Sequence, residues 1–208
     1  MGDGFVQRAI RGNMSGDGAR IAYPLFQGED GGSKPTSPLQ FKVCKISPER
    51  AIALNRKWHS HMPEYRTGWC VAQHCRICYG AMFGGVFYAI AIWSHPNARQ
   101  LPQETWFELR RMAICEDAPK NTASRMIRIM TDDIKRRFPE ITTLISYQDT
   151  SVHTGTIYKA AGWYQASYSE GYDWEFHGEK KRKHPRPKAQ SLAPKIRWEK
   201  RIREYQSA

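Results

Sequence analysis

The sequence lacks any hydrophobic run long enough to cross a bilayer. Its longest mostly apolar stretch, residues 80–93, has 14 residues, whereas a transmembrane helix needs about 20. The first residues, Met-Gly-Asp-Gly-Phe-Val, show neither the basic start nor the apolar core of a secretory signal. We therefore expect a cytoplasmic protein with no membrane partner.

Cysteines are few, and their number is odd. The chain has five cysteines and no visible secretory signal, so we expect reduced thiols instead of a disulfide framework. Cys70, His74, Cys75 and Cys78 lie close enough in sequence to suggest a metal site. A second, separated ligand pair is absent, and His74 directly precedes Cys75, which makes tetrahedral ligation awkward. We favour free cysteines in a hairpin and keep the structural metal as the alternative.

Acidic residues are too few to balance the basic ones. The net charge is +12, and residues 178–208 alone hold eleven Lys or Arg against three Glu. A basic segment of this kind is expected to lie along a polyanion, and we favour double-stranded DNA. Trp198 and Tyr205 lie among the charges and are candidates to stack on bases. A solvated tail and a basic helix on an acidic membrane are the alternatives.

The composition predicts one folded domain with two tails. With 208 residues, 40% of them hydrophobic, the chain can bury a substantial core. Residues 12–37 are rich in glycine and show little periodicity. We expect a flexible N-terminal arm over 1–38, a folded domain over 39–177 and a basic C-terminal tail over 178–208.

Alternating strand and helix signals predict an α/β (α+β) fold with a central twisted mixed β-sheet flanked by helices. Ser47 and Pro48 are a typical helix start, and Pro139 is expected to end the longest helix. We expect strands over 41–46, 106–114, 142–147, from Trp163 and over 168–176, a hairpin over 68–93 that turns at Gly84-Gly85, and helices from Pro48, over 121–138 and over 153–161.

The most informative segment is 146–163. A strand runs directly into Asp149, and a short helix that carries Tyr158 ends at Gly162, which can adopt a positive φ. Side chains just beyond the carboxyl end of a strand lie where ligands usually bind in α/β proteins. We expect Asp149 and Tyr158 to face one nucleobase-sized hollow. The alternative is that Asp149 caps a turn and Tyr158 packs in the core.

Four segments carry a resemblance to a known family. They are Trp58-His59-Ser60-His61, Glu108-Leu109-Arg110-Arg111 with Asn121-Thr122-Ala123-Ser124-Arg125, Ser146-Tyr147-Gln148-Asp149, and 153–163. Residues 40–177 resemble the Mom family of Mu-like bacteriophages, whose fold is similar to that of GNAT acyltransferases. The resemblance implies that residues 39–177 form a catalytic domain that converts adenine in phage DNA to its N6-carbamoylmethyl (acetamido) form, which resists host restriction enzymes.

The resemblance also implies active-site residues. His59, Ser124, Asp149 and Tyr158 would be catalytic, with an acyl-CoA-type donor and an iron ion at His59 and Asp149. The glycine-containing loop with which GNAT enzymes bind pyrophosphate is absent before residue 125. A helix N-terminus still attracts anions, so four residues there are expected to bind the cofactor: Lys120, Thr122, Ser124 and Arg125.

The expected chemistry starts from a weakly nucleophilic adenine amine. Asp149 would hydrogen-bond this amine or take its proton, and Tyr158 would donate to the leaving group. Aromatic residues expected either to stack on a flipped base or to pack in the core are Trp58, Tyr147, Trp163 and Tyr164.

Basic side chains on two predicted elements and in the tail are candidates to bind nucleic acid. They are Arg110, Arg111, Arg136, Arg137, Lys180, Lys181, Arg182, Lys183, Lys195, Arg197, Lys200 and Arg201. Two other functions stay open: a conventional acyltransferase that acts on a small amine or a protein, and a nucleic-acid-binding relative without catalysis. The oligomeric state is also open, with a homodimer as one alternative.

Overall fold

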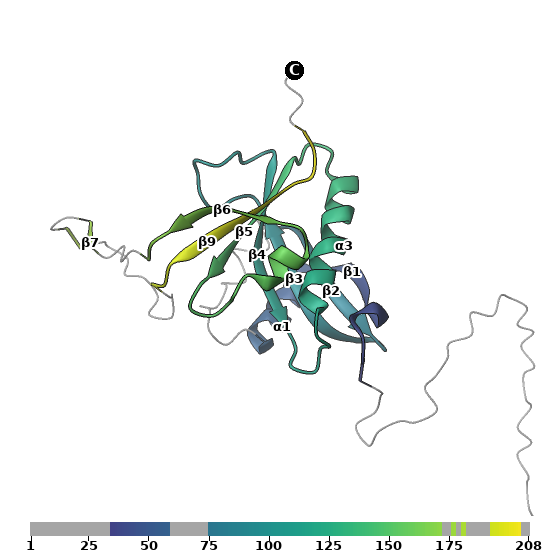
Figure 1. Cartoon of the computed structure of the whole chain (residues 1–208). Helices are drawn as coiled ribbons and strands as arrows, with labels where there is room; N and C mark the ends of the chain where they lie inside the picture. Colours follow the sequence, from purple (N-terminus) through teal and green to yellow (C-terminus); the bar gives the residue numbers. More distant parts are fainter. Residues whose placement is uncertain (1–33, 59–74, 172–175, 178–179, 182–191, 205–208) are drawn as a thin grey trace, which may run out of the picture. The chain divides into compact units, whose positions relative to one another are not determined.

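A seven-stranded mixed sheet with helices on both faces forms the protein (Figure 1), as the sequence predicted. The computed structural model describes residues 34–58, 75–171, 176–177, 180–181 and 192–204. The strand order is β1-β2-β3-β4-β5-β9-β6. Neighbouring strands are antiparallel except β4 and β5, which are parallel.

The sheet contains β1 (Lys42–Ile46), β2 (Cys75–Phe83), β3 (Val86–Ser94), β4 (Trp106–Ile114), β5 (Thr143–Asp149), β6 (Tyr164–Ser169) and β9 (Lys195–Arg201). The helices are the 3-10 turn η1 (Pro38–Gln40), α1 (Pro48–Trp58), α3 (Thr122–Arg137) and α4 (Thr156–Ala160). Two short strands, β7 (Phe176–His177) and β8 (Lys180–Lys181), pair separately. Within the described residues, no helix is both long and apolar enough to cross a membrane.

Strand β3 shows how the sheet comes to be covered on both faces. Ile90 and Ile92 pack with Ile52 of α1, whereas Ala91 and Trp93 belong to the cluster that includes α3 and α4. Successive side chains of a strand point to opposite faces. A continuous apolar strand therefore buries one face under each helical layer.

The local signals for helix ends are confirmed. The Ser47 hydroxyl accepts a hydrogen bond from the backbone N–H of Arg50 at 3.3 Å, at the start of α1. Helix α3 ends at Arg137, two residues before Pro139. Gly162 follows α4 with a φ of +74°.

Strands β4 and β5 pair over only part of their length. Their register runs from Trp106 opposite Thr143 to Leu109 opposite Ser146 and stops there. On its other edge, β4 carries an extra residue at Arg110, because Ile92 pairs with Arg111 and Trp93 with Leu109. Such a bulge bends a strand and redirects its side chains. We call the point where the two strands part, at Leu109 and Ser146, the fork.

The predicted C-terminal tail needs a correction. Residues 195–201 form β9, which lies inside the sheet between β5 and β6. Trp198 is 3% exposed and packs in the core, so it is not free to stack on bases. The alternation of Ile196 and Trp198 with charged residues is a strand pattern that the high charge concealed.

The predicted strand over 168–176 is also wrong, since β6 ends at Ser169 and β7 begins at Phe176. Most of the expected arm lies outside the described residues, as do Tyr205 and much of the segment 178–191.

We expect Trp198→Ala to lower the free energy of unfolding by about 3–5 kcal/mol, because it empties a core site. Urea unfolding of the full chain measures this. The control is Tyr168→Ala, which removes an aromatic that is 57% exposed on β6 and should cost less than about 0.5 kcal/mol. Equal, small effects would mean that residues 195–201 are a peripheral tail.

Candidate active site

Tyr158 of α4 reaches the fork. Its hydroxyl lies 2.8 Å from Ser146 Oγ, which in turn donates to the carbonyl of Leu109 at 3.2 Å. Because the Ser146 hydroxyl has one proton and donates it in the hydrogen bond to the Leu109 carbonyl, the Tyr158 hydroxyl must be the donor in its hydrogen bond with Ser146. Burial raises the pKa of Tyr158, although the Ser146 hydrogen bond opposes this. The phenol therefore stays protonated at neutral pH and keeps a proton to give.

Aromatic packing holds Tyr158 in place. Its ring stacks on Trp198 with centroids 5.5 Å apart, and it is only 7% exposed. The Trp198 indole donates to Gln148 Oε1 at 2.7 Å. Gly155 has a φ of +75°, and a Cβ there would lie 2.5 Å from the same Gln148 oxygen. A residue other than glycine at 155 would therefore disturb the support of Tyr158.

A cavity of about 150 Å³ lies between the end of β4, the start of α3 and α4. Its lining residues are Ile114, Pro119, Asn121, Thr122, Ala123, Ser124, Thr156, Ile157 and Ala160. Two of the residues predicted to bind a cofactor, Thr122 and Ser124, are among them. The other two, Lys120 and Arg125, are not.

The start of α3 presents free backbone donors. Asn121 has a φ of +67° and makes no side-chain cap. Among the described residues, the N–H groups of Ala123 and Ser124 have no hydrogen-bond acceptor. The hydroxyls of Thr122 and Ser124 donate to the carbonyls of Pro119 and Asn121. Free N–H groups at a helix start, where the helix dipole is positive, suit an anionic group.

Asp149 lies on the other face of β5 from Tyr158. Ser146 and Gln148 point toward α4, so strand alternation places Tyr147 and Asp149 on the opposite side. Asp149 Oδ1 accepts from the Ser151 N–H and hydroxyl at 3.0 and 2.6 Å. Asp149 and Tyr158 therefore lie on opposite faces of β5 and do not face the predicted common hollow.

Glu108 was missed by the sequence predictions. It lies on β4 opposite Ser94 and Ile145, on the face that α1 covers in part. Its side chain is 8% exposed; Oε1 lies 3.5 Å from Arg110 Nε, and Oε2 accepts from the Asn97 N–H at 2.7 Å. Burial raises the pKa of the Glu108 carboxyl, while Arg110 opposes the change. A single acid within the apolar segment Trp-Phe-Glu-Leu was the signal available in the sequence.

A second buried acid lies on the same face. Glu199 accepts from the Tyr164 hydroxyl at 3.0 Å and lies 2.8 Å from Arg197 Nε, with its side chain 9% exposed. Tyr147 pairs with Arg197 in the sheet. Burial raises the pKa of the Tyr147 phenol, the charge of Glu108 adds to this, and a hydrogen bond from Arg197 opposes it. We call Glu108, Tyr147, Arg197 and Glu199 the charged row.

Many predicted nucleic-acid contacts have partners within the protein. Arg136 and Arg137 both contact Asp133, at 2.5 and 2.7 Å. Lys195 Nζ lies 3.6 Å from Asp149, and Lys200 donates to the Gly162 carbonyl at 2.8 Å.

Arg110 and Arg197 face the buried acids of the charged row, and Arg111 donates to the carbonyl of Arg110. The side chains of Lys180 and Lys181, and all of Arg182 and Lys183, lie outside the described residues.

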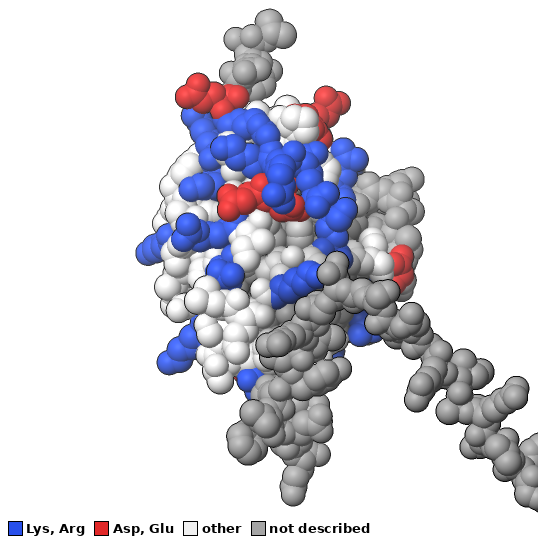
Figure 2. All heavy atoms as spheres, turned by 90° about the vertical axis from the view of Figure 1, so that its right-hand side faces the viewer, with Lys and Arg blue, Asp and Glu red and all other residues white. Residues whose placement is uncertain are grey.

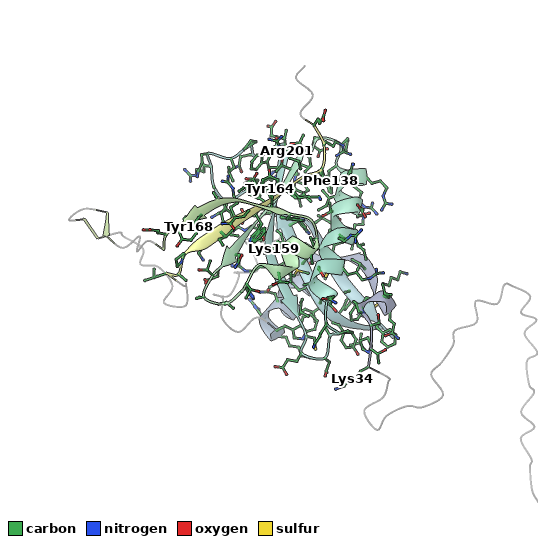
Figure 3. The ribbon with its side chains drawn as sticks, viewed as in Figure 1. Lys34, Phe138, Lys159, Tyr164, Tyr168 and Arg201 are labelled. Carbon is green, nitrogen blue, oxygen red and sulfur yellow. The ribbon has the colours of Figure 1, made fainter. Side chains whose placement is uncertain are left out.

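Basic side chains gather at one end of the molecule. Figure 2 shows Lys and Arg concentrated at the top of the face that carries α3. Arg203 donates to the carbonyls of Lys135, Phe138 and Ile141, which joins the end of β9 to the end of α3. Figure 3 places Arg201 and Phe138 at this end and Lys159 of α4 below them. We define the basic end as Lys135, Arg136, Arg137, Arg201 and Arg203.

The residues described here do not provide the expected iron site. They contain no cluster of three His, Cys, Asp or Glu side chains that could hold a metal ion, and Asp149 contacts Lys195 and Ser151. His59 lies outside the described residues, as do Cys70 and His74. Cys78 is buried, packs against the α1 side and forms no disulfide among the described residues.

The fold is that of the GNAT acetyltransferases. The ribosomal-protein-S18-alanine N-acetyltransferase from Escherichia coli matches with a TM-score of 0.55 and 12% identity, over 80% of this chain and 96% of that one. A Bacillus subtilis acetyltransferase in complex with CoA matches with a TM-score of 0.54 and 12% identity, over 78% of this chain and 99% of that one. AAC(6')-Ib in complex with ribostamycin and coenzyme A matches with a TM-score of 0.55 and 11% identity, over 78% of this chain and 94% of that one.

Within this fold, the chain belongs to the Mom protein family, whose sequence model matches residues 40–206. This match includes β9, which the sequence prediction had placed in a tail. A search of curated proteins finds no match.

We expect the stability of Glu108→Gln relative to the unsubstituted protein to rise from pH 4 to pH 8. A carboxyl whose pKa is raised by folding contributes its stability below its unfolded pKa, about 4.3, and loses it as the pH rises through its folded pKa. Urea unfolding across this pH range measures the difference.

Glu140→Gln is the matched control, since Glu140 is exposed after α3. Its free energy of unfolding relative to the unsubstituted protein should stay nearly constant with pH. If the relative stability of Glu108→Gln instead falls as the pH rises, the arginines hold this carboxylate ionised.

Proposed function

We propose that this protein is a transferase that converts adenine in double-stranded phage DNA to its N6-carbamoylmethyl (acetamido) form in the host cytoplasm, and so protects the DNA from restriction. The observation that carries the proposal is the protonated Tyr158 at the fork, close to the cavity at the start of α3, in a chain of the Mom protein family. The modification itself is what the sequence resemblance implies.

An acyl-CoA-type donor fits the cavity side of the sheet. The phosphates of such a donor are the groups that this side can hold. Thr122 and Ser124 line the cavity, and the free N–H groups of Ala123 and Ser124 suit a phosphate. Two of the matched acetyltransferases were crystallised with coenzyme A, which supports this choice.

Tyr158 is the proton donor in this proposal. Its phenol keeps its proton at neutral pH because it is buried, and Ser146 and Trp198 hold it in one orientation. Loss of a positioned general acid typically slows a reaction about 10²–10⁴-fold. Asp149 lies at the end of β5 on the other face, where it can act on the adenine side.

The basic end is the proposed site for the flanking DNA backbone. Helix α3 has 16 residues, so the basic end lies about 24 Å from the cavity at the helix start. This separation corresponds to about seven base pairs. A target base in duplex DNA must leave the stack to react. The basic end can bind the phosphates of the neighbouring duplex while one flipped base reaches the fork.

A conventional acyltransferase is the second candidate, because the cavity would suit coenzyme A equally well in that case. It predicts tight binding of acetyl-CoA without DNA binding. A relative without catalysis would instead bind DNA and leave the nucleosides unchanged, and this binding would survive Asp149→Ala.

We expect DNA from cells that express the protein to contain a heavier adenosine, detected by digestion and mass spectrometry. Tyr158→Phe should lower its amount by at least about 100-fold, because the phenyl ring keeps the packing but has no proton to donate. Asp149→Ala should also lower it. Tyr168→Phe, an exposed tyrosine on β6, is the control and should match the unsubstituted protein. Full activity of Tyr158→Phe would exclude the proposed proton donor.

We expect Ala160→Trp to weaken coenzyme A binding by at least about tenfold, since an indole at 160 would occupy the cavity. The control is Lys159→Trp, the same change at the preceding position of α4, which does not line the cavity; its affinity should stay within about twofold. Isothermal titration with coenzyme A measures both. Equal affinities for the two variants would place the donor elsewhere.

A further inference from the structure

The charged row contains two buried carboxylates. Glu108 and Glu199 are each about nine-tenths buried, and buried carboxylates are unfavourable unless they are well paired. Glu199 Oε2 accepts from the Tyr164 hydroxyl at 3.0 Å, and Oε1 lies 2.8 Å from Arg197 Nε without forming a hydrogen bond with it. Glu108 Oε2 accepts from the Asn97 N–H at 2.7 Å, and Oε1 lies 3.5 Å from Arg110 Nε. Because each carboxylate oxygen can accept two hydrogen bonds, Glu108 keeps capacity to accept another one.

Tyr147 presents a partly open aromatic surface beside Glu108. It is 36% exposed and follows Ser146, the last β5 residue that pairs with β4. Among the described elements, α1 packs over β2, β3 and β4. An accessible aromatic ring next to a carboxylate suits a flat molecule with an amino group at its edge.

Asp149 is less suited to this contact. Its Oδ1 already accepts two hydrogen bonds, from the Ser151 N–H and hydroxyl, and its Oδ2 lies 3.6 Å from Lys195 Nζ. Glu108, in contrast, lies directly across the fork from the Tyr158 side, since its neighbour Leu109 accepts the Ser146 hydrogen bond. The amine of a base stacked on Tyr147 would therefore lie close to the donor molecule, whose leaving group takes the proton of Tyr158.

We propose that Tyr147 and Glu108 hold the acceptor base: the base stacks on the Tyr147 ring, and the Glu108 carboxylate accepts a hydrogen bond from its exocyclic amino group. This inference rests on the proposed function, because it names the residues that select the substrate of that reaction. A carboxyl oxygen that accepts a hydrogen bond at this position favours adenine over a purine that lacks the amino group. The ring provides stacking that is independent of that group.

Binding of short single-stranded oligothymidylates, each with one central deoxyadenosine or one central deoxyribosyl purine, tests the inference by fluorescence anisotropy on the full chain. The unsubstituted protein should prefer adenine by about tenfold. Glu108→Leu should abolish the preference, and Glu108→Gln, which keeps a neutral acceptor, should retain part of it. Tyr147→Ala should weaken binding of both strands by about tenfold, whereas Tyr147→Phe should bind normally.

Two controls remove charge or an aromatic ring elsewhere. Glu140→Gln and Tyr168→Ala alter exposed residues outside the charged row and should leave the preference and the affinity unchanged. Thermal unfolding verifies that each variant is folded, and Tyr147→Leu replaces Tyr147→Ala if the latter is not. An unchanged adenine preference in Glu108→Leu, or normal affinity of folded Tyr147→Ala or Tyr147→Leu, would overturn the inference.

The outcome is separable from that of the proposed function. The binding experiment needs no donor and no reaction, so an adenine preference that depends on Glu108 supports the inference even if no heavier adenosine is formed in cells. Conversely, formation of that nucleoside by Glu108→Leu at the unsubstituted level would overturn the inference and leave the proposed function intact.

Discussion

The hydrogen bond from Tyr158 to Ser146 connects α4 with β5 at the point where the central sheet divides, and the rest of the site is arranged around it. The Ser146 hydroxyl in turn donates a hydrogen bond to the carbonyl of Leu109, the last β4 residue that pairs with β5. Helix α4 has only five residues and would not be stable alone. It is held by Tyr158 and by the Trp198 ring that stacks on it.

The fork gives the protein two chemically different faces. On the α3 side lie the cavity, the free N–H groups of the helix start and a protonated phenol. On the α1 side lies the charged row, with two buried carboxylates around Tyr147. A transfer between a donor and an acceptor on opposite faces needs such a point of contact. Burial raises the pKa of the Glu108 carboxyl, so the fold disfavours its charged form.

Much of the fold was predictable because its signals are local. Ser47 and Pro48 mark a helix start, Gly162 a helix end, and the segment from 142 to 161 contains the strand and helix expected there. Two of the residues predicted to bind a cofactor, Thr122 and Ser124, line the cavity at the start of α3. Glu108 was missed because one acid in an apolar strand gives no indication of what will surround it.

The sequence by itself determined most strands and helices of the central domain, the continuous apolar run of β3, and the placement of Tyr158 on a short helix after Asp149. Only the tertiary structure decided that β9 inserts between β5 and β6, and that Asp149 and Tyr158 lie on opposite faces of β5. The physical reason is that helix ends and strand alternation depend on neighbouring residues. The pairing of strands, and therefore which side chains meet across the sheet, depends on segments far apart in the chain.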